Sequence, residues 1–215
     1  MRIGVLGTGP VGQALATRLV ELGHEVTMGA RDPANPVAAG WAAAAGERAQ
    51  AGDFAAAAAG AEVVVNATAG THSPAAVRQA ATGGLAGTVL LDVSNALDLS
   101  VFPPVLTVAR DDSVAEQLQR AHPEARVVKA LNTMNGDVMA HPELVAGPHD
   151  VFVAGHDAAA KATVTALLSQ MGWPPESVLD VGGLTAARGL EAGVLFWVSL
   201  RMAIGHDHFN LHVAR

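Results

Sequence analysis

The sequence lacks cysteine altogether, and it is poor in charge. With no cysteine among the 215 residues, disulfide bonds, thiolate metal sites and cysteine nucleophiles are excluded. Only 15% of the residues are charged, the formal net charge is -7, and lysine and arginine form no extended cluster. Binding of nucleic acid requires a basic face that neutralises phosphates, so we expect no nucleic-acid partner.

A long apolar run is missing as well. The most apolar stretch, from Ala192 to Ile204, is short and is interrupted by Ser199 and Arg201, so we do not expect it to span a bilayer. The N-terminus has one arginine and then a strand-like run that ends in glycines, without the apolar core of a signal peptide. We therefore expect a soluble, cytoplasmic protein without a membrane partner.

Half of the residues are hydrophobic, and short apolar runs alternate with helical patterns along the chain. Strands are expected at residues 2–6, 25–29, 62–67, 88–93, 126–130, 151–154 and 178–181. Helices are expected at 10–22, 74–81, 158–170 and 185–204, and one or two surface helices in the alanine-rich stretch 34–60. This alternation predicts an α/β fold with a doubly wound, mostly parallel sheet covered by helices on both faces.

The last of these helices is apolar on almost every side between residues 190 and 204. A helix of this kind should be buried. Either the core of the same chain or a second copy of the protein in a dimer could cover it, and the sequence leaves both possibilities open.

A glycine-rich motif, Gly7-Thr8-Gly9-Pro10-Val11-Gly12, follows the first expected strand and opens the first expected helix. This G-x-G-x-x-G pattern is weak alone, but here a second strand follows at the distance seen in dinucleotide-binding units. The first glycine allows a tight turn, the second lets a pyrophosphate approach the backbone, and the third lets the helix pack close to the strand. Free N–H groups at the helix start attract the anion. The motif therefore predicts dinucleotide binding, with a bare tight turn as the alternative.

The end of the second strand indicates which dinucleotide is bound. An NAD site normally has an acidic residue there to bond the ribose hydroxyls, whereas this sequence reads Met28-Gly29-Ala30-Arg31. A guanidinium at Arg31 suits a ribose 2′-phosphate, which it can hold in bidentate fashion. Asp32 competes in principle, but it lies one residue further along the chain. We therefore expect NADP(H).

The motifs together resemble those of the NADP-dependent oxidoreductases that use coenzyme F-420, a 5-deazaflavin hydride carrier. The matching stretches are GTGPVG, GHEVTMGAR, VVVNAT, VVKALNTM, HDVFVAGHD, VLDVGGLTAARGLE and FNLHVAR, which follow the family's order along nearly the whole chain. The resemblance implies a Rossmann-like NADP-binding domain over residues 1–184 and a C-terminal helical segment over 185–215. It also implies a homodimer and hydride transfer between NADP(H) and a stacked deazaflavin.

The resemblance also implies roles for single residues. It assigns the 2′-phosphate to Thr8 and Arg31, the pyrophosphate to Gly7, Gly9, Pro10, Val11 and Gly12, the ribose beside the nicotinamide to Thr68 and His72, and the nicotinamide to the backbone of Ala130, Leu131 and Asn132. Ala30 and Asn95 join the expected cofactor site because they end strands at the edge where ligands of open parallel sheets bind. The sequence departs from the family at Ala30, where Ser or Thr is frequent, and at Asn35, where a basic residue is frequent.

Several small molecules could accept the hydride. Coenzyme F-420 carries a phosphate and a glutamate tail, so its site should offer positive charge. The candidate cations are Lys129, Arg188, Arg201 and Arg215. A flavin, a quinone or a ferric chelate is the alternative acceptor.

Hydride transfer between stacked rings needs geometry and exclusion of water rather than a nucleophile. His72 and Asn132 are the polar side chains expected to face the reacting rings and to act in catalysis. The acceptor pocket is expected between His72, the segment 132–134 and the C-terminal tail. No metal site is expected from His206, His208 and His212, because no further ligands complete a set.

Two other functions remain compatible with the sequence. Small imine or pyrroline-carboxylate reductases share the N-terminal pattern but usually continue into a longer helical dimerisation domain. A non-enzymatic sensor of the NADP(H) redox state would also use this fold. Oxidation of NADPH by any acceptor would exclude the sensor.

Overall fold

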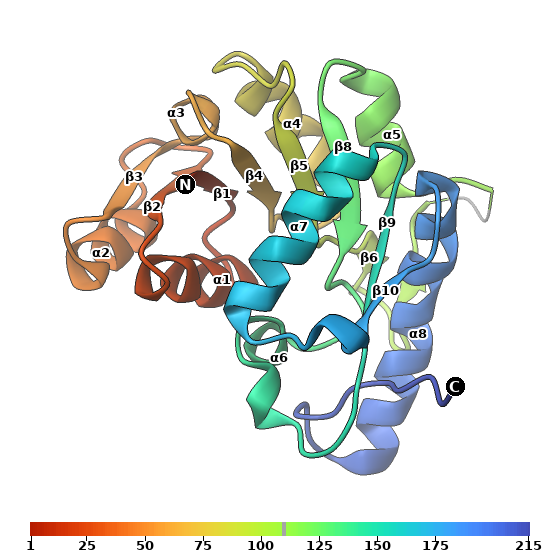
Figure 1. The fold of residues 1–215 in the computed structure, drawn as a ribbon. Helices are drawn as coiled ribbons and strands as arrows, with labels where there is room; N and C mark the ends of the chain where they lie inside the picture. The colour runs from red at the N-terminus through yellow and green to blue at the C-terminus, as the bar shows by residue number, and fades with distance from the viewer. Residues whose placement is uncertain (109–110) are drawn as a thin grey trace.

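In the computed structural model, which describes residues 1–108 and 111–215, helices cover both faces of an eight-stranded sheet (Figure 1). The strands are β1 (Arg2–Leu6), β2 (Glu25–Ala30), β3 (Ala49–Asp53), β4 (Val63–Asn66), β5 (Val89–Asp92), β8 (Arg126–Ala130), β9 (Val151–Gly155) and β10 (Val178–Asp180). The helices are α1 (Pro10–Glu21), α2 (Pro36–Ala45), α3 (Phe54–Ala58), α4 (Ser73–Ala81), α5 (Val114–Ala121), α6 (Gly136–Ala140), α7 (Ala158–Met171) and α8 (Ala187–Ile204). Strands β6 (Leu97–Asp98) and β7 (Val105–Leu106) form a separate small hairpin.

The strand order is β10-β9-β8-β5-β4-β1-β2-β3, and only the β8–β9 pair is antiparallel. The expected doubly wound, mostly parallel sheet is therefore confirmed. From β1 the chain builds outward through β2 and β3, and then returns to the other side of β1 with β4. The topological switch point lies between β1 and β4, where ligands of such sheets bind outside the carboxyl ends.

The alanine-rich stretch 34–60 differs from the expectation of helices alone. It contains α2 and α3, but between them β3 pairs in parallel with β2 at the edge of the sheet. The β3 residues include no β-branched or aromatic side chain, so the sequence carried no strand signal there. Gly46 breaks the helix with φ 94°, and a Cβ on Gly52 would lie 2.9 Å from the Cβ of Ala56. The pairing of residues 49–53 with β2 and their close packing against α3 thus determine that this segment forms a strand.

Helix α8 also differs from expectation, because most of it is not buried within this chain. Its buried residues are Ala187, Glu191 and Val194, near its start. Phe196 and Met202 are 57% and 59% exposed. The alternative that the chain's own core covers the helix is therefore wrong, since only its first turns reach the sheet (Figure 1). Within the described ranges, no helix combines the length and apolarity needed to cross a membrane.

A chain of buried polar groups joins the carboxyl ends of β4, β5 and β8 to α8. The Asn66 amide donates to Asp92 (2.7 Å), and the Lys129 ammonium donates to the other Asp92 oxygen (2.8 Å) and lies 3.0 Å from Glu191. The Glu191 carboxylate also accepts from the first two backbone N–H groups of α5 (2.9 and 3.2 Å). Burial raises the pKa of Glu191, and the Lys129 charge opposes that rise. The Lys129 charge and the backbone N–H groups at the start of α5 together compensate the buried carboxylates of Asp92 and Glu191.

We predict that Lys129→Met lowers the free energy of unfolding by about 3–5 kcal/mol, because it leaves two buried carboxylates without their cation. The matched control is Lys161→Met, since Lys161 pairs with a largely exposed Asp180 and should contribute no more than about 1 kcal/mol. Urea unfolding of both variants measures the difference. If Lys129→Met loses no more stability than about 1 kcal/mol, the buried pairing of Lys129 does not stabilise the carboxyl ends of β5 and β8.

Candidate functional site

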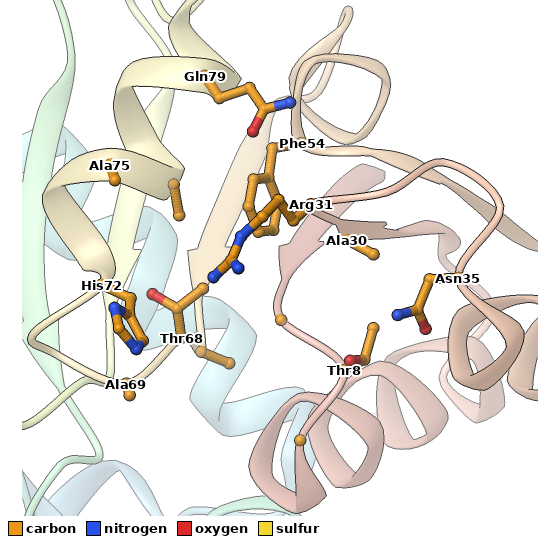
Figure 2. A pocket seen from close by; sticks show the side chains of 14 residues that line it. Thr8, Ala30, Arg31, Asn35, Phe54, Thr68, Ala69, His72, Ala75 and Gln79 are labelled. Atoms are coloured by element: carbon orange, nitrogen blue, oxygen red, sulfur yellow. The ribbon is translucent and has the colours of Figure 1, made fainter.

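A cavity of about 620 Å³ lies at the carboxyl ends of β1, β2 and β4, beside the switch point (Figure 2). Its volume is in the range of ligand-binding sites. It is lined by Gly7, Thr8, Gly9, Ala30, Arg31, Asn35, Phe54, Ala67, Thr68, Ala69, His72, Ala75, Ala76 and Gln79. The structure thus gathers the glycine loop, the end of β2 and the loop after β4 around one space. Asn35, Phe54 and Gln79 were not among the residues assigned to the site from the sequence.

The three glycines of the loop have different environments. Gly7 adopts φ 115°, and a Cβ on Gly12 would lie 2.2 Å from the Gly7 carbonyl oxygen, so the fold itself requires both glycines. A Cβ on Gly9 would meet no described atom within 4 Å. Gly9 is also the N-cap of α1, where no side chain caps the first backbone N–H groups. These groups therefore face open space and suit an anion.

Arg31 follows β2, and Figure 2 shows its guanidinium inside the cavity, on the side of Thr68. No hydrogen bond or ion pair holds Arg31 to another residue in ranges 1–108 and 111–215. The neighbouring Asp32 accepts from the Ala34 backbone N–H (2.9 Å) and so closes its own turn. The Asn35 side-chain oxygen caps α2, which leaves its amide nitrogen for the cavity that Asn35 lines. This edge of the cavity therefore offers a free cation and a free donor.

The loop after β4 forms the opposite wall. The Thr68 hydroxyl donates to the Asn66 side-chain oxygen (2.7 Å) and lies 3.0 Å from the Ser73 hydroxyl, so it is tied to the buried polar chain. His72 is exposed at the start of α4 and lines the cavity. The wall thus combines one braced hydroxyl with one accessible imidazole.

The loop after β8 lies beside the glycine loop but does not line the cavity. A Cβ on Gly136 would lie 3.1 Å from the Val11 side chain. Leu131 has φ 65°, a strained conformation for a branched residue. The Asn132 amide donates to Asn95 (2.9 Å) and to the Leu190 carbonyl oxygen (2.9 Å), and Asn95 donates back to the Asn132 carbonyl oxygen (2.8 Å). In this conformation Asn132 braces the loop against α8, and its expected catalytic role stays a prediction.

The C-terminal tail crosses the same loop. The Asn210 amide donates to the Asp150 carbonyl oxygen (2.9 Å) and lies 4.0 Å from the Met134 sulfur. Phe209 stacks on Trp197 of α8 with ring centroids 5.4 Å apart. The tail of the same chain therefore lies against the segment in which the acceptor pocket was expected.

The four cations considered for an anionic acceptor are engaged within the protein. Lys129 is fully buried in the polar chain, Arg188 pairs with Glu116 (2.7 Å), Arg201 pairs with Asp207, and Arg215 donates to the Glu176 carbonyl oxygen. The tail histidines have ordinary partners as well, such as Asp150 for His212 (3.0 Å). In the part of the chain that the structure describes, no three metal-ligating side chains gather into a site.

Comparisons with known proteins agree with this architecture. Residues 2–96 match the family model of the NADP oxidoreductases described as coenzyme F420-dependent. A solved structure from Arthrobacter sp. FB24, provisionally described as an F420-dependent NADP-reductase, is 46% identical, with a TM-score of 0.93 and coverage of 100% of both chains.

Two further matches are more distant. Metalloreductase STEAP3 of Rattus norvegicus is 33% identical over 195 residues, which are 89% of this chain but 36% of the relative, so the chain spans about a third of that protein. An imine reductase from Myxococcus stipitatus is 19% identical and has a TM-score of 0.63. The match covers 94% of this chain and 63% of the imine reductase, and it shows a likeness of fold alone. The full-length match at 46% identity and the family-model match show that this chain belongs to the coenzyme F-420-dependent family of NADP oxidoreductases.

Proposed function

We propose that the protein binds NADPH along the cavity of Figure 2 and transfers its hydride to a flat ring acceptor. One observation carries this proposal: Gly9 faces open space at an uncapped helix start, in a cavity that also contains the free guanidinium of Arg31. A diphosphate at Gly9 and a ribose 2′-phosphate at Arg31 use both features. NAD lacks the ribose 2′-phosphate and would leave Arg31 without a partner.

The residues present fit each part of NADPH. The N–H groups of α1 would hold the pyrophosphate, while Arg31, the Thr8 hydroxyl and the free Asn35 nitrogen would surround the 2′-phosphate. Thr68 and His72 would lie beside the nicotinamide ribose. The strained Leu131 fixes the direction of the following peptide beside the glycine loop, as pre-organised sites require.

For the acceptor, the 46% identical relative makes the deazaflavin coenzyme F-420 the first candidate. A flavin without a phosphate, such as riboflavin, is the second, and one observation favours an acceptor without an anionic tail. Lys129, Arg188 and Arg201 are paired with carboxylates, and Arg215 donates to a backbone carbonyl oxygen. Either ring would bind by stacking on the nicotinamide, with the C-terminal tail beside it. Protein groups would hold the two rings in contact and exclude water, which is the main requirement for hydride transfer.

We further propose that residues 185–215 complete the acceptor site and that the exposed side of α8 binds a second copy of the chain. Phe196, Met202 and Ile204 are all exposed on this helix, and large apolar side chains left exposed on an otherwise apolar helix suit an interaction surface. A homodimer would bury part of this apolar surface. It would also place the tail, which is attached to the same helix, near the interface.

We predict that the protein reduces a deazaflavin or a flavin with NADPH, and that NADPH deuterated at C4 delivers deuterium to the ring carbon of the deazaflavin. Removal of residues 206–215 should slow acceptor reduction by about 10- to 100-fold, because the acceptor loses its wall, while NADPH affinity is kept. Mass spectrometry of the reduced acceptor and stopped-flow rates measure both effects. NADPH binding without oxidation by any acceptor would indicate the sensor, and transfer to cyclic imines alone would indicate the imine-reductase class.

We also predict that Gly9→Val abolishes NADPH binding but leaves the fold intact. Gly9 has φ -73° and ψ 175°, which any residue can adopt, so only a bound diphosphate would meet the new side chain. Gly40→Val is the matched control, because a Cβ on Gly40 in α2 also meets nothing within 4 Å and lies outside the cavity lining. Titration of NADPH into both variants gives the answer, and wild-type affinity in Gly9→Val would mean that the loop is only a turn.

A further inference from the structure

The cavity continues beyond the groups that suit the phosphates. This end is lined by Phe54 at the start of α3 and by Ala75, Ala76 and Gln79 on α4. Phe54 is only 8% exposed, and in Figure 2 it lies with Arg31 between Gln79 and Thr68. Small alanine side chains on one side and a guanidinium plane on the other make a slot for a flat aromatic ring.

The proposed cofactor would place such a ring in this slot. In NADPH the 2′-phosphate and the base are attached to adjacent carbons of one ribose. A phosphate at Arg31 therefore fixes the base within the same end of the cavity. This step rests on the proposed function.

Gln79 is the polar side chain at this end. Figure 2 shows its amide directed into the cavity, and it is half-buried there. Its side chain makes no hydrogen bond to any residue that the structure describes. An amide presents one acceptor oxygen and one donor nitrogen, which is the pattern that pairs with the amino N6 and ring N7 of adenine.

We propose that Gln79 recognises the base of the dinucleotide and makes the site selective for adenine. Its oxygen accepts from the exocyclic amino group, and its nitrogen donates to the ring nitrogen. In hypoxanthine both of those positions are acceptors, so the amide oxygen would face a carbonyl oxygen. The side chain thus determines specificity and takes no part in hydride transfer.

The test compares NADPH with the reduced nicotinamide hypoxanthine dinucleotide phosphate, using dissociation constants from fluorescence titration. The wild type should prefer NADPH by about 5- to 10-fold, in the lower range of a bidentate base contact. Gln79→Leu should bring the two constants close to equality by weakening NADPH alone. Arg78→Leu is the matched control, since Arg78 is the exposed neighbour on α4 that does not line the cavity, and it should keep the preference.

Two results would overturn the proposal: a wild-type preference that persists in Gln79→Leu, or an equal weakening of both dinucleotides in that variant. The second result would assign Gln79 a purely structural role. Failure of the wild type to bind either dinucleotide is a different outcome, and it would overturn the proposed function itself.

Discussion

The close approach of α1 to the end of β1 is the contact on which the site depends. A Cβ on Gly12 would overlap the Gly7 carbonyl oxygen, at 2.2 Å, so the helix can begin this near the strand only with glycine at both positions. This approach brings the uncapped start of α1 to the switch point between β1 and β4. The positive end of the helix dipole then lies where the cavity opens. The packing of α1 on β1 is therefore what places uncapped backbone N–H groups where an anion can bind.

The second constraint is the buried polar chain that runs from Asn66 through Asp92 and Lys129 to Glu191. It ties the loop that carries Thr68 to the first turns of α8 and to the start of α5. Asn132 and Asn95 add a second brace between the loop after β8 and α8. The walls of the cavity and the C-terminal segment are therefore parts of one hydrogen-bonded frame, and the proposed hydride transfer would need such a frame to hold two rings in register.

Sequence patterns predicted the glycine loop, the place of Arg31 at the end of β2 and the strands of the sheet interior, because each has a strong local signal. Strand β3 could not be predicted, since Ala49–Asp53 becomes a strand only by pairing with β2. Helix α5 did carry a signal that was missed: Ser113 accepts from the Glu116 backbone N–H, as in a capping box. Gln79 and Phe54 reach the cavity only through the packing of α3 against α4, so no spacing along the chain reveals them. The apolarity of α8 predicted a buried helix, but most of the helix is exposed in this chain, and burial by a second copy stays a prediction.

The proposed binding of NADP(H) in the cavity requires that Arg31 holds a ribose 2′-phosphate, and one measurement tests this contact directly. NADPH and NADH are titrated into the wild type and into Arg31→Ala. Loss of a charge-assisted hydrogen bond should weaken NADPH binding by about 1.5–3 kcal/mol and leave NADH binding nearly unchanged. An equal loss for both dinucleotides, or none for NADPH, would contradict the assignment of NADP(H) to this cavity.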